Sequence, residues 1–204
     1  MTSAEQHTRS DLTERLLDHL RAMYVTGEEG PLADALEQRY RSRGEVVRRV
    51  GDSLVVGGPP TSPDAGERPA APSERWSGSR PLVLLVGHLD VVPPTDEDHE
   101  PRVAEVAGAE VVVGRGASDM KAGNVVAMRA FEDPRIREDG PYDLALLLYA
   151  GEEGPAEGNA LRSVLRAVPW LADAMLAVVL EPTDGRVELG CLGGLHALVR
   201  FHGR

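Results

Sequence analysis

The chain has 204 residues, enough to bury a sizeable core as one large domain or as one domain and part of another. Its 22 basic and 33 acidic side chains give a net charge of −11, which argues against nucleic acid and anionic membranes as partners. With a single cysteine, Cys191, a polar N-terminus and no apolar run near the ~20 residues of a membrane span, the sequence predicts a cytoplasmic protein.

The first part of the chain predicts two helices followed by two short strands. Residues 1–10 resemble a frayed tail, and Asp11 is placed to cap a first helix whose apolar residues recur at helical spacing. Pro31 opens a second helix at its first position. Residues 46–50 and 53–56 then have the composition of strands.

Two polar stretches surround the next predicted strand. Residues 57–80 contain five prolines and four glycines and predict a mobile surface loop; a domain boundary there is the weaker alternative. Residues 93–101 are a second loop, with an acidic run that we interpret as solvated. The valine-rich halves of 103–113, divided by Gly108, predict a hairpin.

Between these loops, an unbroken aliphatic run from Leu82 to Val86 leads into Gly87 and His88. A short run of this kind is typical of a strand buried on both faces. His88 and Asp90 are two positions apart, so in extended backbone both side chains face one pocket. The second nitrogen of a metal-bound histidine usually donates to a carboxylate or a carbonyl, which is the arrangement this spacing permits.

The second half alternates helices and apolar strands. A glycine-rich loop, 114–123, precedes a helix over 124–131 that Pro134 ends. Further elements are predicted in chain order as a strand over 142–149, a helix beginning near Asn159, a buried strand over 175–180, and strands over 187–189 and 195–201.

Imidazole and carboxylate groups follow the three apolar strands. His88, Glu152, Glu153 and Glu181 stand at strand ends, and Asp119 lies in the glycine-rich loop. Intervals of 31 residues from His88 to Asp119, 34 to Glu153 and 28 to Glu181 fit the steps of a parallel α/β sheet. Parallel strands therefore bring these groups to one edge, where a divalent metal would relieve their mutual repulsion. One histidine with several carboxylates suits zinc, cobalt or manganese.

Adjacent Glu152 and Glu153 predict a division of roles. Flanking glycines permit a twist that lets both side chains reach the site, so one can bind metal while the other acts as a base. Zinc lowers the pKa of bound water to about 7, and a free carboxylate can pass its proton to a leaving amine. These parts predict the hydrolysis of an amide.

Four ordered motifs resemble those of the dinuclear zinc amidohydrolases, the family of aminoacylases, acetylornithine deacetylase, succinyl-diaminopimelate desuccinylase and dipeptide-cleaving carboxypeptidases. The resemblance runs from Thr26 to the C-terminus, and its motifs are Gly87 to Pro93, Gly114 to Gly123, Glu152 to Gly154 and Glu181 to Thr183. The stretch from Glu181 to Gly194 is most similar to the desuccinylase branch.

The resemblance implies a zinc-exopeptidase-like α/β domain with a mostly parallel central sheet flanked by helices. It implies two Zn²⁺ ions, with Co²⁺ or Mn²⁺ as alternatives, bridged by Asp119 and often accompanied by a cis peptide after that residue. His88 and Glu181 complete one metal site and Glu153 belongs to the other, with Glu152 as general acid/base and Asp90 orienting His88. The implied substrate is an N-acyl amino acid, foremost N-succinyl-LL-2,6-diaminopimelate.

Family members are considerably longer and insert an α+β dimerisation or lid domain after the strand that ends at Glu181. We therefore expect residues 1–186 to form the first part of the catalytic domain and 187–204 to begin the inserted domain. The chain is then a truncated fragment of an enzyme that is homodimeric at full length. Deacetylation or dipeptide cleavage remains an alternative activity, and an inactive metal-binding remnant is the alternative of another class.

Overall fold

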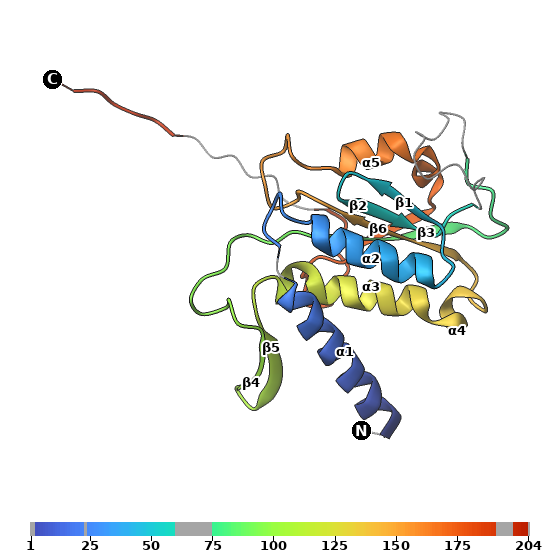
Figure 1. Ribbon diagram of the computed structural model, residues 1–204, viewed down its shortest axis with the longest axis horizontal. Helices are drawn as coiled ribbons and strands as arrows, with labels where there is room; N and C mark the ends of the chain where they lie inside the picture. Colours follow the sequence, from blue (N-terminus) through green and yellow to red (C-terminus); the bar gives the residue numbers. More distant parts are fainter. Residues whose placement is uncertain (1–2, 23, 60–74, 191–197, 204) are drawn as a thin grey trace.

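The computed structural model describes residues 3–22, 24–59, 75–190 and 198–203 (Figure 1). The helices are α1 (Ser3–Arg21), α2 (Gly30–Ser42), α3 (Ala122–Glu132), α4 (Pro134–Arg137) and α5 (Leu161–Ala167), with single irregular turns η1 (Ala117–Lys121) and η2 (Pro169–Asp173). The strands are β1 (Val47–Val50), β2 (Ser53–Val56), β3 (Leu82–His88), β4 (Arg102–Val106), β5 (Ala109–Val113), β6 (Asp143–Tyr149) and β7 (Leu176–Val179). No helix among these described residues is long and apolar enough to cross a membrane.

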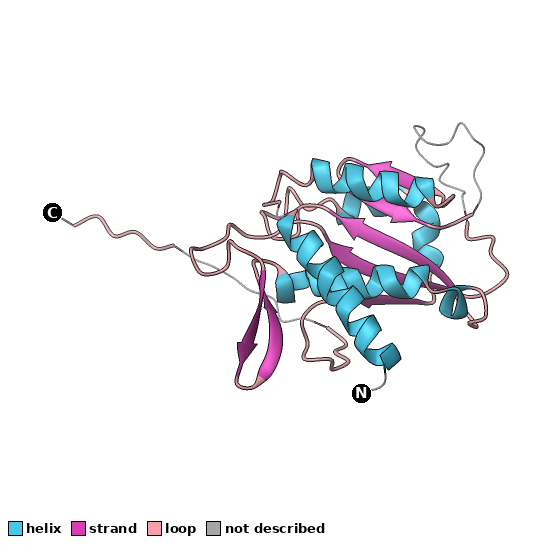
Figure 2. Cartoon of the chain, turned by 60° about the horizontal axis from the view of Figure 1, so that its bottom comes forward, coloured by secondary structure: helices cyan, strands magenta, loops and turns pink. Residues whose placement is uncertain are grey.

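The predicted α/β fold is confirmed. A five-stranded sheet has the order β1-β2-β6-β3-β7, in which β3 runs parallel to both β6 and β7. β1 and β2 extend the sheet with antiparallel pairing, so the sheet is mixed. The second sheet is the β4–β5 hairpin, which stands apart from the central sheet in Figure 2.

Helices cover both faces of the central sheet because its strands carry apolar side chains on both faces. On β6, Leu146 and Leu148 pack into a cluster with α2 and α3, which includes Tyr40 and Phe131. Ala145, Leu147 and Tyr149 of the same strand point the other way, into a cluster with α5 and η2. This period-two alternation is what a strand buried on both faces requires. Figure 1 shows the two helical layers on either side of the sheet.

Most predicted elements lie where the pattern placed them, including the hairpin, whose turn uses positive φ at Ala107 and Gly108. The predicted start of the first helix at Asp11 is wrong, because α1 begins at Ser3. Asp11 is an interior residue whose carboxylate accepts a hydrogen bond from Arg15 Nε at 3.1 Å. The residues before it, such as Ala4 and Glu5, favour helix by propensity and extend α1.

The predicted burial of the strand over 175–180 is also wrong. Leu176 and Val179 of β7 are each 51% exposed, because β7 is the edge of the sheet and, among the described residues, pairs only with β3. Apolar composition predicted a strand there correctly, but burial depends on neighbours that the local sequence does not specify.

The prediction of two C-terminal strands is wrong for the residues that the structure describes. Residues 187–190 and 198–203 form no strand, and the side chains of Val187 and Leu189 are exposed. No described residue pairs with their backbone, and a strand needs a partner. Residues 191–197 lie outside the described residues, as do 60–74 of the predicted mobile loop. The division of the chain after residue 186 stays a prediction.

Candidate metal centre

The carboxyl ends of the parallel strands meet at one edge of the sheet. His88 of β3 is opposite Tyr149 of β6, and Val86 is opposite Val179 of β7. Two backbone hydrogen bonds continue this register past the strand ends, from Leu89 N to the Tyr149 carbonyl at 2.8 Å and from Leu180 N to the Val86 carbonyl. The segments that carry the candidate side chains therefore leave the sheet side by side.

The structure brings together the side chains that the sequence analysis singled out. His88 Nε2 lies 3.1 Å from Asp119 Oδ1 and 4.0 Å from Glu181 Oε1. His88 shares one group of mutually close ligand atoms with Asp119 and Glu181, and a second with Glu152 and Glu153; within each group the atoms lie within 4.8 Å of one another. Both adjacent glutamates thus reach the site, as the flanking glycines predicted, and Gly151 has a φ of +76°.

The His88 ring is held from its other nitrogen by Asp90. Its Nδ1 lies 3.0 Å from the Asp90 backbone carbonyl and 3.5 Å from Asp90 Oδ1. With the proton on Nδ1, the ring donates mainly to the carbonyl and leaves Nε2 free to face Asp119 and Glu181. The carbonyl is thus nearer to the ring than the carboxylate that we expected to orient it.

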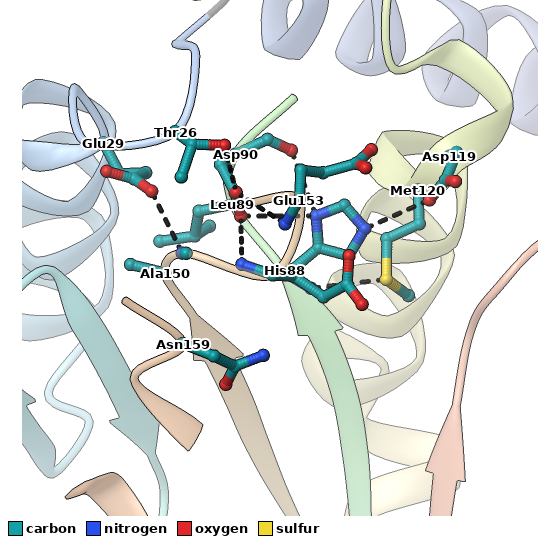
Figure 3. A network of polar contacts seen from close by, with 12 residues as sticks. Thr26, Glu29, His88, Leu89, Asp90, Asp119, Met120, Ala150, Glu153 and Asn159 are labelled. Carbon is teal, nitrogen blue, oxygen red and sulfur yellow. Dashed lines mark hydrogen bonds and ion pairs between the residues drawn. The ribbon is translucent and has the colours of Figure 1, made fainter. Parts of the chain in front are cut away.

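The carboxylate of Asp90 is used elsewhere in the site (Figure 3). It accepts hydrogen bonds from Thr26 Oγ1 at 2.8 Å, from Glu152 N at 3.1 Å and from Glu153 N at 3.0 Å. Asp90 therefore fixes the turn that carries both glutamates. Sequence reasoning did not assign this role, because the bonds join residues 62 and more positions apart.

The glycine-rich loop is fastened to the end of β3. The Asp119–Met120 peptide is cis, as the family resemblance implied. The buried Met120 sulfur accepts a hydrogen bond from His88 N at 3.3 Å, and Asn124 Nδ2 donates to the His88 carbonyl at 2.6 Å. These contacts hold Asp119 beside the Nε2 edge of the His88 ring, as Figure 3 shows.

Three further polar side chains near the site were missed from the sequence: Glu29, Lys121 and Asn124, which are at most 3% exposed. Lys121 Nζ donates to the Leu89 carbonyl at 3.0 Å, between the two residues of the His-x-Asp pair. The sequence shows only that a lysine lies in the glycine-rich loop; the burial of Lys121, which calls for a partner such as this carbonyl, is seen in the structure alone.

The electrostatics reflect crowded negative charge. Burial raises the pKa of Glu181 to about 7; the charge of His88 opposes the shift and that of Asp119 adds to it. Burial and the charge of Asp119 also raise the pKa of Glu153. Burial by itself would lower the pKa of His88, but Asp90, Asp119 and Glu181 outweigh it and raise that pKa to about 9.

A divalent cation fits this donor set. Carboxylates whose pKa values are raised by burial and by one another are stabilised by positive charge, and the neighbouring imidazole offers a neutral nitrogen once deprotonated. One histidine with carboxylate oxygens suits zinc, cobalt or manganese. Asp90, in contrast, has a pKa below its usual value: burial would raise it, but hydrogen bonds from His88, Thr26 and two backbone amides dominate.

Comparison with known proteins gives an independent view of the chain. The family model described as "Peptidase family M20/M25/M40" matches residues 84–191, which include the whole cluster. The succinyl-diaminopimelate desuccinylase of Corynebacterium glutamicum is 32% identical over 196 residues, which cover 94% of this chain and 46% of that protein. The chain thus spans about half the length of this curated relative.

Solved structures agree on the fold. Human carnosine dipeptidase 1 superimposes with a TM-score of 0.59 at 17% identity, over 85% of this chain and 39% of that one. A tripeptidase from Staphylococcus aureus gives a TM-score of 0.54 at 16% identity, over 83% of this chain and 42% of that one. At these identities the likeness supports the fold alone.

Proposed function

Because the chain belongs to peptidase family M20/M25/M40, a family of metal-dependent hydrolases, we propose that it hydrolyses the amide bond of an N-acylated amino acid. The proposed substrate is N-succinyl-LL-2,6-diaminopimelate, and the products are succinate and LL-2,6-diaminopimelate. The desuccinylase that is 32% identical to this chain supports this substrate. Because the chain spans only 46% of that relative, the proposed activity is that of a protein of the relative's full length. The observation that carries it is the convergence of His88, Asp119, Glu152, Glu153 and Glu181.

In this proposal His88, Asp119 and Glu181 would hold one divalent ion, and Asp119 and Glu153 would hold a second. The first set is a group of close ligand atoms in the structure, and Glu153 lies beside it in the second group. The chemistry that bound divalent ions supply is polarisation of the substrate carbonyl and acidification of a water molecule. Asp90 keeps the His88 ring and the Glu152–Glu153 turn in place through the contacts described above.

Glu152 is the proposed general base and general acid. Its carboxylate takes a proton from the water whose oxygen attacks the amide carbonyl carbon. The carbon–nitrogen bond then breaks, and Glu152 gives the same proton to the departing amine. The water is consumed, one carboxylic acid and one amine are formed, and Glu152 ends in its starting state; the acid then loses its proton to the amine, which gives a carboxylate and an ammonium group.

A second candidate is metal binding without turnover. It is favoured by one observation: within the described residues, His88 is the only histidine in the two groups of ligand atoms, so both draw on the same imidazole. A zinc site that lacks ligands binds metal more weakly and orients it less well.

One experiment separates the two candidates. The metal-free protein is titrated with Zn²⁺ or Co²⁺, and release of succinate from N-succinyl-LL-2,6-diaminopimelate is followed at each step, with N-acetylornithine and a dipeptide as alternative substrates. Turnover that depends on metal and disappears in Glu152→Ala, while metal uptake is retained, supports the hydrolase. Uptake near one equivalent with no turnover on any substrate supports the second candidate.

A further inference from the structure

The turn that carries Glu152 and Glu153 is fixed through four consecutive backbone amides. Ala150 N donates to Ser53 Oγ at 3.1 Å, and Gly151 N donates to Glu29 Oε1 at 3.0 Å. The next two amides, as described above, donate to the two carboxylate oxygens of Asp90. Two buried carboxylates, from Glu29 and Asp90, thus hold three successive amides.

Glu29 reaches this turn from a distant part of the chain. The residue lies immediately before α2, and 122 positions of sequence separate it from Gly151. Its second oxygen, Oε2, accepts a hydrogen bond from Gly27 N at 2.9 Å. Residue Glu29 is only 2% exposed, and a carboxylate that accepts two backbone amides has a fixed orientation. Figure 3 shows Glu29 beside Ala150 and Thr26.

The two carboxylates also act through one shared segment. Gly27 N binds Glu29, and the neighbouring hydroxyl of Thr26 binds Asp90 Oδ2 at 2.8 Å. The short turn of Thr26 and Gly27 is therefore joined to the Glu152–Glu153 turn through two carboxylates. Asp90 links Thr26 to Glu152 and Glu153, and Glu29 links Gly27 to Gly151. Buried negative charge needs compensation, and the ammonium of Lys121, 1% exposed, interacts with the charges of Asp90 and Glu29.

We propose that Glu29 is a positioning residue that sets the geometry of the Glu152–Glu153 pair by holding the Gly151 amide. The proposal rests on the proposed function, in which Glu152 moves a proton and Glu153 holds metal. Without the Glu29 carboxylate, the buried Gly151 amide loses its acceptor, and the turn can rotate away from His88. Catalytic groups tolerate little displacement, since a shift of about 1 Å can cost roughly 100-fold in rate.

The test compares Glu29→Gln with a matched control, Glu132→Gln. A glutamine oxygen accepts from one amide, but its NH₂ group then faces the other amide donor, so one of the two bonds is lost. Glu132, the last residue of α3, has a side chain that is only 5% exposed, and it pairs with Arg15 and Arg39 rather than with the turn at Gly151 to Glu153. Both variants are expected to lose some folding stability, so a loss of stability does not by itself test the proposal.

Two readouts are measured on the full chain: amide hydrogen exchange at Gly151 to Glu153 by NMR, and the affinity and visible spectrum of bound Co²⁺. In Glu29→Gln we expect exchange at these amides to be at least about tenfold faster, and Co²⁺ to bind about 10- to 100-fold more weakly with an altered spectrum. In Glu132→Gln both readouts should stay at wild-type values. Wild-type exchange and an unchanged Co²⁺ spectrum in Glu29→Gln would overturn the proposal.

The outcomes distinguish this proposal from the function on which it rests. If the wild-type protein takes up no Co²⁺, the proposed metal centre is contradicted, and amide exchange alone decides the role of Glu29. If circular dichroism shows that Glu29→Gln does not fold, Glu29→Asp goes through the same measurements. Aspartate keeps the charge but is too short to reach both amides, so an intermediate acceleration of exchange is expected, and wild-type exchange would refute the proposal.

Discussion

Two clusters of carboxylates in this molecule have opposite surroundings. At the end of α3, the Glu132 carboxylate forms ion pairs with three guanidinium groups. Its oxygens lie 3.0 Å from a nitrogen of Arg15, 2.8 Å from one of Arg39 and 3.9 Å from one of Arg43. At the strand ends, the charges of Asp119 and Glu152 act on Glu181 and Glu153, and the charge of His88 opposes them. The same residue type is thus neutralised in one place and crowded in the other.

The pKa values follow this difference. Burial would raise the pKa of Glu132, but its arginines lower it below the usual value. The pKa of Glu181 is instead raised to about 7. A carboxylate that supports the fold comes with its counterions, whereas carboxylates gathered without them are stabilised by a cation from solution. The raised carboxylate pKa values at the strand ends therefore favour a metal centre there, whereas Glu132 already has its counterions.

The largest expected effect is on catalysis. Glu152→Gln keeps the size of the side chain but cannot take a proton, so kcat should fall roughly 10²- to 10⁴-fold with little change in metal affinity. Steady-state hydrolysis and metal titration of the same sample measure both quantities. Retention of more than a tenth of wild-type kcat would remove Glu152 from its role, and Glu132→Gln provides the control that should stay active.

The next effect concerns the neutralised cluster. Glu132→Gln leaves three arginines without their shared partner; because these arginines are 35%, 37% and 46% exposed, we expect a loss of only about 1–2 kcal/mol in the free energy of unfolding. Urea denaturation of the metal-free protein measures it. A change in metal affinity of more than about twofold in this variant would erase the distinction between the clusters.

The two clusters should respond to pH in opposite directions in the metal-free protein. The lowered pKa of Glu132 gives stability that is present above its unfolded value of 4.5 and is lost as the pH falls below it. The raised pKa of Glu181 gives stability that is present below 4.5 and is lost as the pH rises through about 7.

Denaturation midpoints between pH 3 and 8 test this pair of signs. Glu181→Gln should flatten the decline between about pH 4.5 and 7, and Glu132→Gln should flatten the decline on the acid side. Equal pH profiles for the two variants would show that the clusters do not differ electrostatically in the way described.

An exposed pair provides the smallest effect and a lower reference point. Arg75 lies 2.8 Å from Asp173, but the arginine side chain is 73% exposed. Arg75→Ala should therefore change the free energy of unfolding by less than about 1 kcal/mol and leave metal affinity untouched. A loss as large as that of Glu132→Gln, measured in the same urea series, would mean that burial does not set the strength of these pairs.

Much of the site could be predicted because its signals are local. His88 and Asp90 follow an aliphatic run, and Glu152 and Glu181 follow two others, so strand prediction alone placed them at one edge. The exposed β7 was predicted as buried because its apolar residues do not reveal which strand lies at the edge. The local sequence around Asp11 does not distinguish a capping aspartate from one inside a helix, and α1 begins eight residues earlier, at Ser3.

The supporting contacts could not be predicted for a different reason. Glu29 binds a backbone amide 122 positions away, and a backbone amide has no residue-type signature. Lys121 likewise donates to a backbone carbonyl, that of Leu89. Such bonds follow from the assembled fold and from no motif. The cytoplasmic location and the homodimer stay predictions.

The metal centre proposed here consists of the crowded strand-end carboxylates and His88. Its existence is tested most directly by calorimetric titration of the metal-free protein with Zn²⁺ at neutral pH, in wild type, His88→Ala, Asp119→Asn and Glu132→Gln. We predict tight binding in wild type and in Glu132→Gln, and a loss of at least about 100-fold in the other two variants. Equal Zn²⁺ affinity in wild type and in His88→Ala would contradict the proposed centre.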